Sequence, residues 1–177
     1  EQLDAINSLM PYTNGVLAAT TAFGKTVTAA ALIARKKINT LVLVHSKALL
    51  LQWHERLTDF LDIDFVEPDM PKKRGKKKVF SPIGCLDSTS NTLHGVIDIA
   101  LMQSCLENGE VKPFVQEYGM VIVDECHHVS SVTFEHVLKH VTARYVYGLT
   151  ATPIRKDGLQ PIIFMQCGVI RFSSDCL

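Results

Sequence analysis

Apolar and polar residues along the chain fall into blocks that predict strands alternating with helices. A short apolar run that is rich in β-branched residues and bounded by polar or turn residues is typical of a strand. Six runs fit this description: Gly15–Ala19, Thr40–His45, Val96–Leu101, Met120–Asp124, Tyr145–Leu149 and Ile162–Val169. Because these runs are continuously hydrophobic instead of alternating, they indicate parallel strands that are buried on both faces.

Three segments between these runs have the character of helices: Lys25–Arg35, which is rich in alanine, Lys47–Phe60 and Ser131–His140. The last two carry apolar residues at helical spacing that are expected to face a core: Leu49, Leu50, Trp53, Leu57 and Phe60, then Val132, Phe134, Val137 and Leu138. Alternating strands and helices predict an α/β fold, a doubly wound and mostly parallel sheet with helices on both faces. Functional sites in such folds lie at the carboxyl ends of the strands.

Residues 62–95 interrupt this alternation. The segment contains three prolines and has six cationic residues within the seven positions from Lys72 to Lys78. It predicts a long basic surface loop, either a solvated insertion or a contact with the phosphate backbone of a nucleic acid. Since the chain has no internal repeat and no second apolar core, residues 1–177 are expected to form a single domain.

The composition excludes several classes of protein. Hydrophobic residues make up 47% of the chain and charged residues 20%, as in soluble globular domains and unlike disordered chains. The formal net charge is zero, so no global field attracts DNA or a membrane, and no apolar run approaches a membrane span in length. Five cysteines without a C-x-x-C spacing favour reduced thiols in a cytoplasmic protein.

The first predicted strand leads into a sequence that suits phosphate binding, Ala19–Thr26, which ends in Gly-Lys-Thr at the start of a predicted helix. Backbone N–H groups and the helix dipole favour an anion there, while the lysine reaches the β- and γ-phosphates and the following hydroxyl ligates Mg²⁺. The strict phosphate-loop pattern is not met, because Ala19 stands at the position of its first glycine. The predicted nucleotide-binding residues are Thr21, Ala22, Phe23, Gly24, Lys25 and Thr26.

Two adjacent carboxylates, Asp124 and Glu125, follow the apolar run Met120–Val123. Carboxylates at the end of a buried strand are costly unless a cation compensates their charge, and Mg²⁺ with ATP would supply that compensation. Asp124 is expected to bind the metal together with Thr26, and Glu125 to orient and deprotonate the attacking water. The predicted catalytic residues are therefore Lys25, Asp124 and Glu125, and the predicted cofactors are ATP and Mg²⁺.

In their order, these segments resemble the first RecA-like domain of the superfamily 2 DEAD/DEAH-type helicases and translocases. The motifs that carry the resemblance are Ala19–Thr26, Asp124–His127 and Thr150–Thr152, with Leu43–Lys47 similar to motif Ia and Asp98–Ser104 similar to motif Ib. The chain looks closest to the type III restriction subunits and the repair translocases. The resemblance implies an ATP-dependent motor domain that acts on nucleic acid, with DNA expected rather than RNA.

The resemblance also assigns roles to residues that the composition does not single out. Gln2 would read the adenine, and His127, Thr150 and Thr152 would couple the nucleotide site to the rest of the motor. The expected nucleic-acid contacts are His45, Ser46, Lys47, Gln103, Ser104 and Arg155. A second RecA-like domain, which supplies arginine fingers in such motors, is absent from these residues, so the fragment alone should be nearly inactive. The alternative function is a phosphate-loop ATPase or switch that acts on protein partners.

Two further features bear on the site. Most relatives have glycine at the position of Ala22, and if that position required a positive φ, alanine would cost about 1 kcal/mol. His136 and His140 have the i,i+4 spacing of a helical metal pair and lie near Cys126, His127 and His128. No acid lies between the two histidines as in H-E-x-x-H, so no structural zinc is expected.

Overall fold

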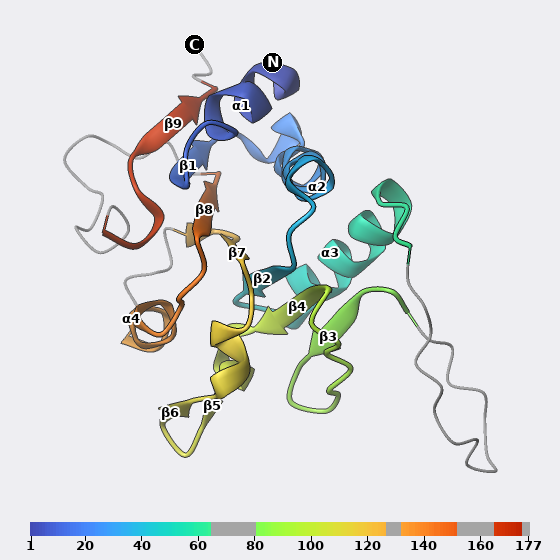
Figure 1. Cartoon of the computed structure of the whole chain (residues 1–177), viewed down its shortest axis with the longest axis vertical. Helices are drawn as coiled ribbons and strands as arrows, with labels where there is room; N and C mark the ends of the chain where they lie inside the picture. The colour runs from blue at the N-terminus through green and yellow to red at the C-terminus, as the bar shows by residue number, and fades with distance from the viewer. Residues whose placement is uncertain (65–80, 127–131, 152–164, 175–177) are drawn as a thin grey trace.

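A computed structural model of the chain describes residues 1–64, 81–126, 132–151 and 165–174 (Figure 1). Its main feature is a seven-stranded sheet in the order β3-β4-β2-β7-β8-β1-β9, in which each neighbouring pair is parallel. The strands are β1 (Asn14–Ala18), β2 (Thr40–Val44), β3 (Gly84–Leu86), β4 (Ile97–Leu101), β7 (Met120–Val123), β8 (Tyr145–Thr150) and β9 (Ile170–Ser173).

Helices cover both faces of this sheet. They are α1 (Gln2–Leu9), α2 (Lys25–Lys36), α3 (Lys47–Phe60) and α4 (Val132–Lys139), with short 3-10 turns η1 (Thr21–Phe23), η2 (Met102–Cys105) and η3 (Pro113–Gln116). A small antiparallel hairpin is formed by β5 (Leu106–Glu107) and β6 (Glu110–Val111).

Successive residues of one strand pack into different cores. Val42 and Val44 of β2 belong to the core beneath α1, α2 and α3, whereas Leu41 and Leu43 belong to the core beneath α4 and η2. Figure 1 shows this arrangement, with α4 separated by the sheet from α2 and α3. Burial on both faces explains why the strands read as continuous apolar runs, and the predicted doubly wound parallel α/β fold is confirmed.

Several element predictions were wrong in detail. The last strand begins at Ile170, beyond the predicted run Ile162–Val169, of which residues 162–164 lie outside the described part. β3 lies within residues 62–95, the segment that was predicted as a loop, and residues 65–80 of that segment are not described. Neither α1 nor the β5–β6 hairpin was predicted. Short edge strands carry too few residues for a clear apolar period.

Two residues expected in the core are exposed. Val132 has 83% of its surface exposed and Phe60 has 46%. Each is the terminal residue of its helix, and the buried residues of α3 and α4 lie inside these ends. Helical spacing predicts the face of a residue but not where the neighbouring sheet stops covering the helix.

Candidate nucleotide site

The phosphate loop is shaped by a glycine in the left-handed region. The chain leaves β1, passes through the turn Thr21–Phe23, and reaches Gly24 with φ of 87° before α2 begins at Lys25. A Cβ at Gly24 would lie 2.5 Å from the side-chain nitrogen of Gln2. The positive φ therefore favours glycine at this position, and a Cβ would in addition displace the end of the Gln2 side chain.

Gln2, the predicted adenine-reading residue, lies against this loop. Its Nε2 donates a hydrogen bond of 2.8 Å to the carbonyl oxygen of Phe23. The two residues are 21 positions apart in the chain. The structure thus brings Gln2 to the predicted site, while its role toward adenine stays a prediction.

Ala22 does not carry the strain that its substitution for glycine could have caused. It lies in the 3-10 turn, is exposed, and is not among the residues with positive φ. The expected cost of about 1 kcal/mol was conditional on a positive φ and so does not apply here.

Lys25 is a buried cation with neutral partners. Only 7% of its surface is exposed, and its Nζ donates to the carbonyl oxygens of Ala19 at 3.0 Å and Thr20 at 3.2 Å. A buried ammonium that is held by carbonyl groups gains when an anion replaces them, because hydrogen bonds between charged partners are stronger. The position of Lys25 at the start of α2 therefore suits a phosphate group.

Asp124 follows the buried strand β7 directly and is 6% exposed. Its Oδ2 accepts a hydrogen bond of 2.7 Å from Nε1 of Trp53, and its Oδ1 accepts one of 2.9 Å from the backbone N–H of Glu125. Burial raises the pKa of Asp124 above its ordinary value, while the Trp53 hydrogen bond and the nearby charge of Lys25 oppose this shift. The charge of Lys25 is the smallest of these influences on the pKa of Asp124.

Glu125 has a backbone conformation that is unusual for its residue type. Its φ is 50°, in the left-handed region that non-glycine residues seldom adopt. Residues in such strained conformations concentrate at functional sites, where the surrounding structure holds them in place. The strained backbone at Glu125 is therefore consistent with a functional role for this residue.

Thr150 connects the phosphate loop to β8, the strand that lies between β1 and β7. β8 lies between β7 and β1 in the sheet, and the buried Thr150 at its end accepts a hydrogen bond of 3.0 Å through its carbonyl oxygen from the N–H of Ala19. The other predicted coupling residues, His127 and Thr152, lie outside the described residues.

The described nucleic-acid candidates lie at the same edge of the sheet. β2 and β4 run in register, with Val44 opposite Leu101, so the segments 45–47 and 103–104 that follow these strands are neighbours. Ser46 caps α3 by accepting a hydrogen bond of 3.3 Å from the N–H of Leu49. Arg155 lies outside the described residues.

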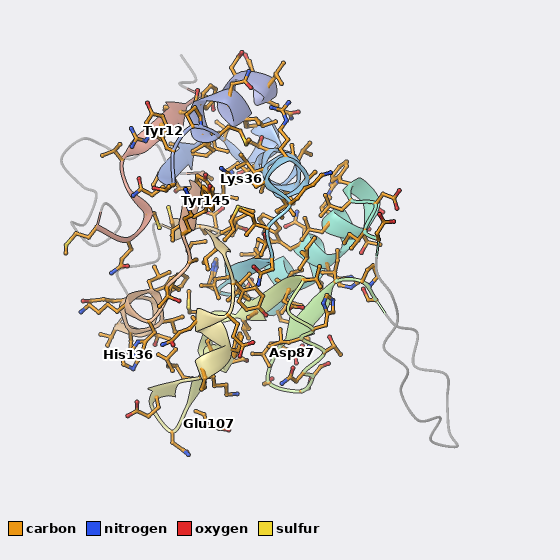
Figure 2. The ribbon with its side chains drawn as sticks, in the orientation of Figure 1. Tyr12, Lys36, Asp87, Glu107, His136 and Tyr145 are labelled. Carbon is orange, nitrogen blue, oxygen red and sulfur yellow. The ribbon has the colours of Figure 1, made fainter. Side chains whose placement is uncertain are left out.

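Lys47 is held by an acid that the sequence did not single out. Its Nζ lies 3.1 Å from Oδ2 of Asp87, in the turn that follows β3, and 3.5 Å from the hydroxyl of Thr89. Hydrogen bonds from Thr89, followed by that from Lys47, lower the pKa of Asp87 below its ordinary value. Asp87, which is labelled in Figure 2, therefore stays ionised near neutral pH and competes with any phosphate for Lys47.

The donor set of the site fits a magnesium nucleotide. Asp124 offers a buried carboxylate directly after β7, and Lys25 and Thr26 offer an ammonium and a hydroxyl at the start of α2, after β1 of the same parallel sheet. Oxygen ligands are those that Mg²⁺ prefers. Within the described part of the chain, no group of three or more His, Cys, Asp and Glu side chains could hold another metal ion. His127 and His128 are outside that part, so the expected absence of zinc stays a prediction.

The described cysteines and helices bear on two further features that the sequence analysis considered, the state of the thiols and the length of apolar segments. Cys85, Cys105, Cys126 and Cys167 are free thiols, and burial raises the pKa of Cys126, whose side chain is fully buried beside the site. Among the described residues, no helix has the length and apolar character needed to cross a membrane.

Sequence reasoning placed Trp53 in the core but missed its contact with Asp124. The available signal was chemical, because a buried indole N–H requires a hydrogen-bond acceptor. Asp87 had no comparable signal, since its turn belongs to the segment predicted as an irregular loop.

The sequence of the chain matches a known protein family and is similar to known helicases and translocases. Residues 1–155 match the family described as type III restriction enzyme, res subunit. Putative helicase 109L of Invertebrate iridescent virus 3 is 33% identical over 167 residues, which cover 93% of this chain and 46% of that relative. The DNA 3'-5' translocase XPB2 of Sulfurisphaera tokodaii is 27% identical over 165 residues, which cover 92% of this chain and 33% of that relative.

The chain therefore spans less than half the length of each of these two relatives. Among solved structures, the UvsW helicase of bacteriophage T4 superposes with a TM-score of 0.69 at 16% identity, covering 96% of this chain and 57% of the other. At that identity the similarity concerns the fold, and it agrees with the sheet and helices described above.

Proposed function

This chain belongs to the family of the type III restriction enzyme res subunit, and we propose that it binds Mg²⁺·ATP and drives movement of its parent protein on nucleic acid. It is a first RecA-like domain of the superfamily 2 helicases and translocases. The observation that carries the proposal is that Lys25 and Asp124 are both buried and follow two parallel strands of the same sheet, Lys25 at the start of α2 after β1 and Asp124 directly after β7.

The residues of the chain have separate duties in this proposal. Lys25 exchanges its two carbonyl partners for phosphate oxygens, and Gly24 lets the loop approach them closely. Thr26 and Asp124 hold Mg²⁺, which when bound neutralises charge on the phosphates. Glu125 accepts a proton from the attacking water.

Two segments that have no role in nucleotide binding favour a motor that acts on nucleic acid over a switch that acts on protein partners. The segments 45–47 and 103–104 gather at one edge of the sheet and carry hydroxyl, amide and cationic groups suited to phosphate and sugar. The DNA translocase among the relatives supports DNA as the partner. We further propose a cytoplasmic protein whose second RecA-like domain completes the catalytic cleft.

Removing one phosphate contact tests the nucleic-acid path. Lys47→Ala in the whole protein should weaken binding of single-stranded DNA and reduce the slope of log K against log [salt] by about 0.7–0.9, since one counterion fewer is released. Asp87→Asn should strengthen binding, because it removes the carboxylate that competes for Lys47. Fluorescence anisotropy of a labelled oligonucleotide at several salt concentrations measures both effects.

Lys139→Ala is the matched control, because Lys139 is an exposed lysine on α4 that is likewise paired with a single acid, Glu135. It should leave the slope unchanged. A Lys47→Ala protein whose salt slope equals that of the unsubstituted protein would remove Lys47 from the proposed path.

A further inference from the structure

Trp53 is the only tryptophan in the chain and stands in the middle of α3. Its side chain is 1% exposed and packs in the core with Leu50 and Leu57 of the same helix. An aliphatic or phenyl side chain could fill much of this space. Packing alone therefore does not explain why the position carries an indole.

The indole has one hydrogen-bond donor, and that donor is directed at the nucleotide site. Nε1 of Trp53 lies 2.7 Å from Oδ2 of Asp124, although the two residues are 71 positions apart in the chain. The distance is at the short end for an N–H···O bond, as expected when the acceptor is an ionised carboxylate. This bond joins α3 to the end of β7 across the core.

The remaining contacts of Asp124 leave room for a metal while fixing its carboxylate plane. Oδ1 accepts from the N–H of Glu125, and the backbone N–H of Asp124 donates to the carbonyl oxygen of Leu43 at 3.0 Å. Each carboxylate oxygen therefore has one protein donor, and a carboxylate has about four acceptor positions in all. Two of these positions therefore receive no hydrogen bond from the described residues.

We propose that Trp53 is a positioning residue that orients the Asp124 carboxylate toward Mg²⁺. This inference rests on the proposed nucleotide site. Hydrogen-bond partners behind a metal ligand fix its orientation, and their loss typically lowers metal affinity by about 10–100-fold. A purely structural role for the bond would lower stability without altering the dependence of nucleotide binding on Mg²⁺.

The test compares ADP binding to the chain as Mg²⁺ is titrated, in the unsubstituted protein and in Trp53→Phe. The variant keeps an aromatic ring and loses the N–H donor. We expect the Mg²⁺ concentration at half-effect to rise about 10-fold, with ADP affinity in excess EDTA unchanged. Leu57→Val is the control, since it removes a methylene from the same buried face of α3 without touching Asp124.

A second measurement uses the unsubstituted protein and so does not depend on a variant that folds. Because the chain has a single tryptophan, its emission reports on Trp53 alone. The emission should change over the same range of Mg²⁺ at which ADP binding tightens, and should stay constant when Mg²⁺ is added without nucleotide.

The outcomes separate this inference from the proposed function. If the unsubstituted chain binds no nucleotide, the proposed function fails. If it binds nucleotide but Trp53→Phe has the same Mg²⁺ dependence as the unsubstituted chain, or shifts it no more than Leu57→Val does, the positioning role is overturned. Emission that stays constant throughout the titration with ADP would overturn it as well.

Discussion

Replacing Glu125 with glutamine in the whole protein should lower ATP turnover by roughly 10²–10⁴-fold while ATP still binds, because a general base contributes about that much to a rate. Glutamine keeps the size of the side chain and removes its ability to accept the proton of water. The strained backbone at Glu125 and its position next to Asp124 are the structural grounds for the assignment. Steady-state phosphate release and equilibrium binding of labelled ATP measure the two properties separately.

The control for this substitution is Glu117→Gln, which changes an exposed acid on the loop before β7. It should leave turnover unchanged. Normal turnover in Glu125→Gln would place the base elsewhere, and loss of ATP binding together with turnover would mean that Glu125 supports the site structurally.

The second large effect concerns the 177 residues alone. They should hydrolyse ATP about 10³–10⁵-fold more slowly than a protein that also has the second RecA-like domain, because an arginine finger is worth that much in rate. In the proposed site Lys25 is the buried cation at the phosphate loop among the described residues, and an arginine from a second domain would add compensation for charge that develops on the γ-phosphate. Phosphate release with and without DNA, at matched concentrations, gives the ratio.

Adding the second domain as a separate chain provides a control, since turnover should rise with its concentration. Vigorous DNA-stimulated hydrolysis by the 177 residues alone would contradict the requirement for a second domain. In that case a second copy of the chain would have to supply the missing arginine.

The five clear strands and the helix Lys47–Phe60 could be predicted because buried parallel strands and amphipathic helices leave strong periodic signals. The phosphate loop and the acid pair could be predicted because each follows such a strand. β3 was missed because a strand of three residues has no measurable period, and α1 because its eight residues make little more than two helical turns.

The contacts within the site could not be predicted from the sequence. Nothing in the spacing of Trp53 and Asp124 indicates that α3 and β7 bring them into hydrogen-bond distance. The same holds for Asp87 and Lys47. The resemblance placed Gln2 at the nucleotide site, but it did not indicate its hydrogen bond to the carbonyl oxygen of Phe23. These pairs depend on the order of the strands in the sheet, which local sequence patterns do not specify.

Calorimetric titration of the chain with Mg²⁺·ADP, with and without the substitution Lys25→Ala, tests the central claim most directly. Loss of the ammonium should weaken binding by about 10–100-fold or more, because hydrogen bonds to charged groups are worth roughly 1.5–3 kcal/mol each. Arg35→Ala, which removes an exposed cation from the last turn of the same helix, should bind as the unsubstituted chain does. Equal affinity in Lys25→Ala and the unsubstituted chain would contradict a nucleotide site at this loop.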